Sequence, residues 1–185
     1  MRRLSDKGKN RYILKQQKKF FHYVCVLAGS GLRDREARNL RWRDYRWEVE
    51  DDGQEFVYLQ VTGKTDAQKV VAMPYIKMHL EALQSRDEFS DDDDYIFVNK
   101  NGEKLTNQNK TFADILKRVG LHKDTHGRYR SLTSLRHYYA TTRLKEGEVD
   151  VFRLAENMGN KIEQIKNHYA EVNPYVFRRH LTKRK

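Results

Sequence analysis

Residues 132–141 read Leu-Thr-Ser-Leu-Arg-His-Tyr-Tyr-Ala-Thr, a stretch centred on Arg136. A second arginine motif lies far upstream, where residues 31–36 read Gly-Leu-Arg-Asp-Arg-Glu around Arg33. A late tyrosine follows in Asn-His-Tyr-Ala at residues 167–170. Two guanidiniums can hold one phosphate in a bidentate fashion, and the phenol of Tyr169 can attack it. The three segments together favour chemistry on a phosphodiester.

The charge of the chain favours a polyanionic partner. The 185 residues fit one domain and carry a formal net charge of +11. Basic residues gather in 1–46, 100–145 and 178–185, whereas acidic residues gather in 48–55 and 87–94. This separation indicates one face for nucleic acid and another for solvent. A basic protein that is merely soluble is the alternative reading.

Several other classes of protein are disfavoured. Cys25 is the only cysteine and lies in an apolar run, so we interpret it as a small buried hydrophobe. His122 and His126 are four residues apart without a clear third ligand, so no metal site and no cofactor are expected. No apolar stretch is long enough to cross a membrane, and no signal peptide is visible, so a cytoplasmic protein is expected.

Hydrophobic periodicity predicts a mainly α fold with one small antiparallel β-sheet, an α+β class. Gly29-Ser30-Gly31 ends the first predicted helix, and Asp51-Asp52-Gly53 marks a turn between strands. The predicted helices cover residues 12–28, 32–40, 74–83, 107–119, 133–145, 149–158 and 161–170, and the predicted strands cover 47–50, 56–61 and 69–73.

The motifs together resemble the catalytic domain of the tyrosine recombinases, the phage integrase family. The first arginine motif of that family resembles residues 31–37 with 40–44, and the second resembles 134–141. The C-terminal motif resembles residues 157–160, and the nine-residue step from Asn160 to Tyr169 agrees with the family spacing. Each motif is weak alone, but their order and separations make the set specific. The resemblance implies a DNA breaking-rejoining catalytic core.

The resemblance implies a site-specific DNA recombinase that cleaves and rejoins DNA through a 3′-phosphotyrosine intermediate. Its catalytic residues would be Arg33, Lys64, Arg136, Asn160 and Tyr169. The covalent link conserves the energy of the broken bond, so the reaction needs neither ATP nor a metal ion. Other tyrosines compete for the role of nucleophile: Tyr138 and Tyr139 beside the second arginine, and Tyr175 beyond the motif.

Basic residues outside the arginine pair are assigned by the same resemblance. Lys64 lies in Thr-Gly-Lys-Thr between two predicted strands, where the family places a lysine that protonates the leaving 5′-oxygen. On spacing alone, Lys64 is interpreted as a solvated turn lysine. Lys69 is the alternative acid and is otherwise expected to contact DNA, as are Arg128 and Arg130.

Two positions depart from the family pattern. Thr133 stands where the family often has histidine, and Asn160 where it usually has histidine or tryptophan. Both residues can still form hydrogen bonds, but neither can accept or release a proton near neutral pH as a histidine can. His137 is interpreted as a buried support and alternatively as the missing base, while Glu36 is expected to orient Arg33. Two alternative functions follow: a catalytically weak DNA-binding domain, or DNA relaxation like that of type IB topoisomerases.

The domain division and the partners follow from the same comparison. We expect a basic linker remnant at residues 1–11, the catalytic domain at 12–172 and a basic tail at 173–185. Whether a DNA-binding domain precedes the linker is left open. The expected partners are double-stranded DNA, further copies of the chain in a homotetramer on DNA, and accessory DNA-bending proteins. In the cytoplasm the bound protein would associate with the nucleoid.

Overall fold

The computed structural model describes residues 6–62, 67–85, 88–146 and 149–169, with side chains over 14–62, 67–85, 88–146 and 149–165. The elements are α1 (Asp6–Ser30), α2 (Asp34–Asn39), η1 (Trp42–Asp44), β1 (Tyr45–Val49), β2 (Glu55–Thr62), β3 (Ala67–Ala72), α3 (Ile76–Gln84), α4 (Asn109–Arg118), α5 (Thr133–Glu146), α6 (Val151–Met158) and α7 (Ile162–Tyr169). The predicted class is confirmed: a mainly helical fold with one small antiparallel sheet.

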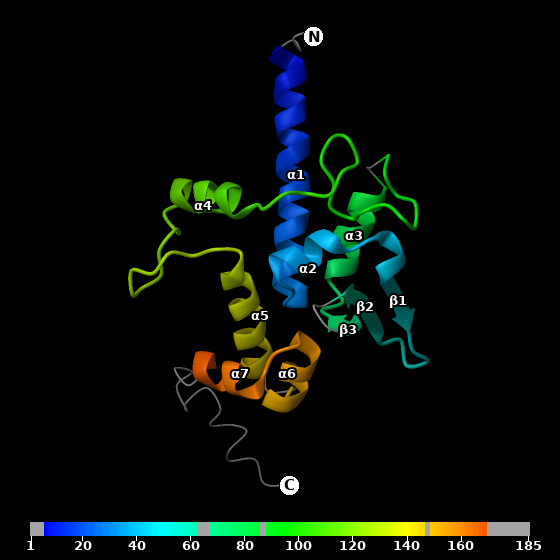
Figure 1. Ribbon diagram of the computed structural model, residues 1–185. Helices are drawn as coiled ribbons and strands as arrows, with labels where there is room; N and C mark the ends of the chain where they lie inside the picture. Colours follow the sequence, from blue (N-terminus) through cyan, green and yellow to red (C-terminus); the bar gives the residue numbers. More distant parts are fainter. Residues whose placement is uncertain (1–5, 63–66, 86–87, 147–148, 170–185) are drawn as a thin grey trace.

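Helix α1 forms the central axis of the fold, with the sheet and α3 on one side and α4 and α5 on the other (Figure 1). Phe20, Tyr23, Val26 and Leu27 recur at helical spacing and are buried. The helix begins at Asp6, earlier than the predicted start at residue 12. The polar residues 6–11 include two lysines and one arginine, which favour helix. The described part of the expected linker is therefore helical; its role as a linker stays a prediction.

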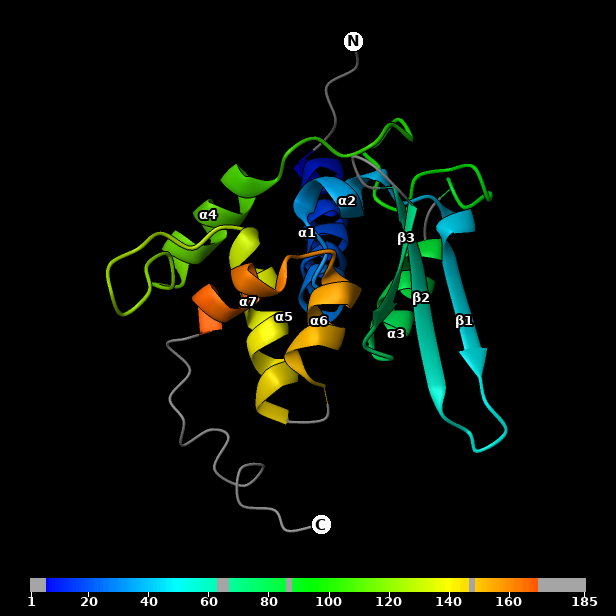
Figure 2. The ribbon, with the colours of Figure 1, turned by 60° about the horizontal axis from the view of Figure 1, so that its bottom comes forward.

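The sheet has the order β1-β2-β3, with both pairs antiparallel. Val57, Leu59 and Val61 on β2 point into the core and are almost fully buried, while the alternate residues face outward. Val70 and Ala72 on β3 share the same buried face. The sheet thus presents one apolar face to α1 and α3, and one edge to α6 (Figures 1 and 2).

A second, smaller core holds the last three helices together. It is built from Tyr139, Ala140 and Leu144 of α5 with Leu154, Ala155, Met158 and Ile165 of α6 and α7. Figure 2 shows α6 and α7 lying against α5. This packing brings the turn between α6 and α7 next to the middle of α5, where the second arginine motif lies.

Cys25 and the helix lengths give two further findings. Cys25 is half-buried on α1 rather than fully buried, and burial raises the pKa of its thiol. No described helix combines the length and the low charge that crossing a membrane requires.

A histidine pair links α1 to α3. The Nδ1 atoms of His22 and His79 lie 3.0 Å apart, so the N–H of one ring donates a hydrogen bond to the other ring. His79 is buried, and Phe21 and Tyr75 contact its ring edge-on. Burial lowers the pKa of His79.

This pair predicts a pH dependence of stability. Because the pKa of His79 is lowered in the folded state, the unfolded chain binds a proton first as the pH falls below about 6.5. The free energy of unfolding should therefore fall between pH 7 and pH 5, and the fall should be smaller in His79→Asn. Urea denaturation at a series of pH values measures it. His126→Asn, in an exposed loop, is the control and should keep the full fall.

Candidate active site

Arg33 is placed by a tight turn between α1 and α2. Gly31 adopts a φ of +66°, and a Cβ there would meet the Tyr139 ring at 2.4 Å, so only glycine fits. Arg33 then caps α2, where its backbone N–H donates to Glu36 Oε2 at 2.8 Å. Its guanidinium donates to Glu36 Oε1 at 2.6 Å. Glu36 therefore contacts both the backbone and the guanidinium of Arg33 from one turn away; its role in orienting Arg33 for a reaction stays a prediction.

Arg136 lies at the end of the first turn of α5 and is buried, with a side chain only 7% exposed. One guanidinium nitrogen, Nη1, donates to the carbonyl oxygen of Gly31 at 2.5 Å. The other, Nη2, donates to the carbonyl oxygen of Met158 at 2.5 Å. A buried cation needs such partners, and the carbonyl at the C-terminal end of α6 carries the negative end of that helix dipole. Arg136 thus joins the α1–α2 turn to the end of α6.

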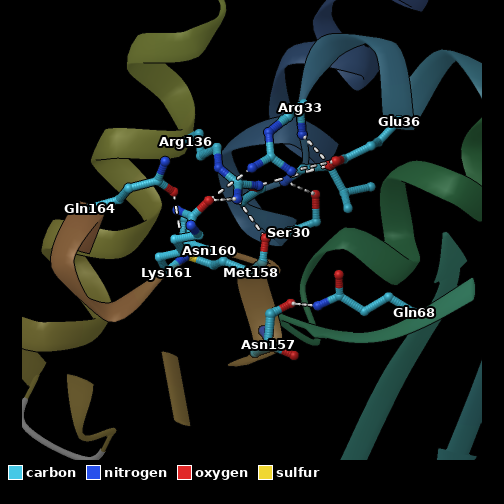
Figure 3. A network of polar contacts seen from close by, with 12 residues as sticks. Ser30, Arg33, Glu36, Gln68, Arg136, Asn157, Met158, Asn160, Lys161 and Gln164 are labelled. Atoms are coloured by element: carbon cyan, nitrogen blue, oxygen red, sulfur yellow. Dashed lines mark hydrogen bonds and ion pairs between the residues drawn. The ribbon is translucent and has the colours of Figure 1, made fainter. Parts of the chain in front are cut away.

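The two guanidiniums converge on one atom. Nη2 of Arg33 and Nη2 of Arg136 each donate to Oδ1 of Asn160 at 2.8 Å (Figure 3). Asn160 directly follows Gly159, which ends α6 in the left-handed conformation. Residues from three distant segments of the sequence therefore share one acceptor oxygen.

The electrostatics of this group leave one positive charge uncompensated within it. Glu36 Oε2 lies 3.8 Å from Nη1 of Arg136, and Glu36 Oε1 accepts from the guanidinium of Arg33, so a single carboxylate serves two guanidiniums. The side chain of Arg33 is 49% exposed, whereas Arg136 lies beneath the surface. An anion can approach from the side of Arg33.

The other residues of the second motif differ in their exposure on α5. Thr133 is the first residue of the helix and is exposed, while His137 is half-buried. Tyr139 is buried and its hydroxyl donates toward the carbonyl oxygen of Val71 at 3.4 Å. Burial raises the pKa of Tyr139, which makes it a poor nucleophile. Tyr138 is exposed but lies about 200° around the helix from Arg136.

Other predicted residues are placed in part or not at all. Lys64 lies outside the described residues, within the segment 63–66 that joins β2 to β3. Tyr169 is the last residue of α7, and its side chain is outside the described set, as is all of Tyr175. Lys69 is exposed on β3, with Nζ 3.8 Å from the centre of the Tyr58 ring. The roles of these residues stay predictions.

Arg128 and Arg130 lie together in the loop between α4 and α5. Nε of Arg128 donates to Asp124 Oδ2 at 2.7 Å, and this bond lowers the pKa of Asp124 to about 2. A guanidinium nitrogen of Arg130 donates to the carbonyl oxygen of Leu121 at 2.8 Å. Both side chains are thus held by their own loop, on the α4 side of the molecule (Figure 1).

Sequence reasoning missed two residues that join the sheet to α6. Asn157 pairs with the backbone of Val71, and Gln68 binds the last carbonyl groups of α6 (Figure 3). An asparagine on a short helix and a glutamine on an edge strand both look solvated in the sequence. The one available signal was Gly159, because a glycine that ends a helix permits close approach of another segment.

No metal site accompanies these residues in the described part of the chain, where no three histidine, cysteine or carboxylate side chains gather. His122 and His126 are separate loop residues: the first is half-buried and the second exposed.

The chain belongs to the phage integrase family, whose model matches residues 7–175. This match extends over both arginine motifs, the Asn160 turn and Tyr169. No curated protein sequence matches the chain.

Solved structures of recombinases share the fold. The XerA recombinase superposes with a TM-score of 0.66 at 20% identity, covering 100% of this chain and 66% of its own. The XerH site-specific recombinase, bound to its palindromic difH substrate after cleavage, gives 0.65 at 17% identity, covering 87% and 44%. The Tn1549 transposon integrase with transposon right end DNA gives 0.62 at 16% identity, covering 96% and 64%. The chain therefore spans about half to two thirds of the length of these proteins.

The close packing of Gly159 against Gln68 can be tested by substitution. Gly159 has a φ of +60°, and a Cβ there would lie 2.3 Å from Gln68 Oε1. Gly120 has a φ of +71° with nothing within 4 Å, so it provides the matched control. Gly120→Ala should lower the free energy of unfolding by about 1–2 kcal/mol through backbone strain alone. Gly159→Ala should lower it further, because Gln68 must also move.

Denaturant titration of both variants measures this difference. Equal losses in the two variants would mean that Gln68 does not pack against Gly159.

Proposed function

We propose that this chain is the catalytic part of a site-specific DNA recombinase that cleaves and rejoins DNA through a 3′-phosphotyrosine. Membership of the phage integrase family supports the proposal. The observation that carries it is the shared acceptor, because Arg33 and Arg136 both donate to Oδ1 of Asn160 at 2.8 Å.

The shared acceptor marks where a scissile phosphate would bind. A single oxygen that accepts from two guanidiniums occupies the position that a non-bridging phosphate oxygen would take. The surplus positive charge of the Arg33, Arg136 and Glu36 group would be neutralised by one phosphodiester. Fixed cations stabilise the charge that develops on these oxygens during attack, and each such donor typically contributes about 10²- to 10³-fold to the rate.

The proposed reaction exchanges one phosphodiester for another. The phenol oxygen of Tyr169 forms a bond to phosphorus as the phenol proton passes to solvent water, and the bond from phosphorus to the 5′-oxygen breaks. Lys64 donates a proton to the departing 5′-oxygen, with Lys69 as the alternative donor. Reversal of these steps with a second 5′-hydroxyl rejoins the strand, so neither ATP nor a metal ion is consumed.

The structure also gives a reason for weaker catalysis. Asn160 replaces the usual family histidine, and its amide oxygen already accepts from both arginines. A phosphate must displace this internal acceptor. Its affinity is therefore lower than it would be for a pair of arginines with no acceptor between them. A DNA-binding domain with little catalysis is therefore the second candidate function. Relaxation of DNA without partner exchange is the third, and assembly into a tetramer on DNA stays a prediction.

A covalent capture experiment tests the proposal. Nicked DNA duplexes with a randomised central sequence are incubated with the protein, denatured, and screened for protease-sensitive protein–DNA adducts whose DNA is then sequenced. The nick lets the short cleaved strand diffuse away and traps the tyrosyl link. We expect one enriched sequence with the wild type and no adduct with Tyr169→Phe. Tyr138→Phe, on the far side of α5, should retain the adduct.

Several outcomes separate the candidates. Recombinant product from two copies of the recovered site supports recombination, whereas relaxed plasmid without product supports the topoisomerase-like alternative. Binding without any adduct supports the DNA-binding alternative and contradicts the proposal.

Arg33 provides a quantitative prediction for the same assay. Arg33→Ala removes one of the two guanidiniums at the surface of the site, so the rate of adduct formation at saturating DNA should fall about 10²- to 10³-fold. Thermal melting should show that the variant remains folded, because the side chain is half exposed. A rate within a factor of two of the wild type would remove Arg33 from the proposed site.

The loop between α4 and α5 predicts a salt effect on DNA binding. If Arg128 and Arg130 each contact one phosphate, replacing either by glutamine should reduce the slope of log affinity against log salt by about 1. Fluorescence anisotropy with a duplex at several salt concentrations measures this slope. Arg46→Gln, on β1 at the opposite side of the molecule, should leave it unchanged (Figure 1). Equal slopes in all variants would place the DNA elsewhere.

A further inference from the structure

The edge of β3 is paired with a side chain of α6. The backbone N–H of Val71 donates to Oδ1 of Asn157 at 2.8 Å, and Nδ2 of Asn157 donates to the carbonyl oxygen of Val71 at 3.0 Å. One amide group thus satisfies both backbone groups of an edge residue, as a neighbouring strand would. Nδ2 also lies 3.3 Å from the hydroxyl of the buried Tyr139.

A second contact runs the opposite way, from β3 to α6. Nε2 of Gln68 donates to the carbonyl oxygens of Glu156 and Asn157 at 2.6 Å and 3.0 Å. These carbonyl groups belong to the last turn of α6, where the oxygen of Glu156 also accepts from the N–H of Gly159. Gly159 lets the glutamine approach, because a Cβ there would clash with it. We call the contacts of Gln68 and Asn157 the β3–α6 joint.

The β3–α6 joint connects the residues proposed to bind the phosphate with the strand that carries Lys69, a candidate proton donor. Asn157 lies three residues before Asn160 and one before Met158, whose carbonyl oxygen accepts from Arg136. Gln68 lies four residues after Lys64, and Lys69 lies between Gln68 and Val71 on the same strand. Figure 3 shows Gln68 and Asn157 meeting just beside the arginine pair. Lys69 is therefore on a strand that is fastened to the residues proposed to bind the phosphate, and Lys64 precedes this strand in the sequence.

We propose that Asn157 and Gln68 are positioning residues that fix the lysine-bearing strand relative to Arg33, Arg136 and Asn160. This inference rests on the function proposed above. The arginines hold the non-bridging oxygens, while the lysine must reach the bridging 5′-oxygen of the same phosphate. The joint helps to set the distance between these two groups, together with the bond from the Met73 N–H to the carbonyl oxygen of Gly29 near Arg33.

The proposal predicts a defect that is specific to the leaving group. Misplacing a catalytic group by about 1 Å can cost about 10²-fold in rate. Loss of the joint should therefore slow proton donation to the 5′-oxygen, while binding of DNA by the arginines persists. A substrate whose leaving atom needs no proton should be cleaved almost normally.

The experiment compares two nicked duplexes that carry the recovered target sequence. One has the ordinary phosphodiester, and the other has sulfur in place of the bridging 5′-oxygen. A thiol has a pKa near 8.5, far below that of an alcohol, so the thiolate leaves without a proton. For each protein we would measure the affinity for DNA and the first-order rate of adduct formation at saturating DNA.

Asn157→Leu keeps the side-chain size and removes both hydrogen bonds to Val71. We expect its cleavage of the ordinary duplex to be about 10- to 100-fold slower than that of the wild type. On the sulfur duplex its rate should return close to that of the wild type, and its affinity for DNA should change little. Asn99→Leu, which removes comparable bonds from the distant 99–103 turn, should cleave both duplexes normally.

Gln68→Met provides an independent variant with the same length and no donor, and it covers the case in which Asn157→Leu fails to fold. An equal slowing on both duplexes, or normal cleavage by folded variants of both residues, overturns the positioning role while the proposed function stands. If the wild type forms no adduct on either duplex, the proposed function fails and the inference fails with it.

Discussion

The buried guanidinium of Arg136 is the interaction on which the rest of the site depends. It donates to the carbonyl oxygens of Gly31 and Met158 and to the side chain of Asn160. These acceptors come from the turn after α1, the end of α6 and the turn before α7. Removing a buried cation from such partners leaves several carbonyl groups unsatisfied, which is costly. One side chain therefore holds together three segments that the sequence separates widely.

Charge balance explains why this arrangement suits an anion. The carboxylate of Glu36 serves both Arg33 and Arg136, and the described oxygens of Gly31, Met158 and Asn160 that also accept from these guanidiniums are neutral. Fixed cations that are already oriented need little reorganisation when charge develops on a substrate. The β3–α6 joint extends the same network to the sheet, through Asn157 and Gln68. The proposed phosphate site and the strand that carries Lys69 are thereby parts of one connected network.

Apolar periodicity is a local signal, and it predicted the helices and the sheet. The meeting of Arg33 with Arg136 was inferred instead from the set of motifs and its resemblance to the tyrosine recombinases. It placed the first helix too late, since polar residues after Asp6 gave no apolar stripe to mark its start. It gave no role to Asn157 or Gln68, because their partners are backbone groups of distant segments. Because almost every residue carries the same backbone groups, no sequence pattern predicts such contacts. Tertiary packing alone determines them.

A crystal soaked in tungstate tests the central claim most directly, because tungstate is a tetrahedral oxyanion with strong anomalous scattering. The account predicts one tungstate ion within hydrogen-bond distance of the guanidiniums of both Arg33 and Arg136. The ion should displace Oδ1 of Asn160 from its place between them. A tungstate bound by Arg33 alone, with Asn160 still joined to Arg136, would contradict a shared phosphate site.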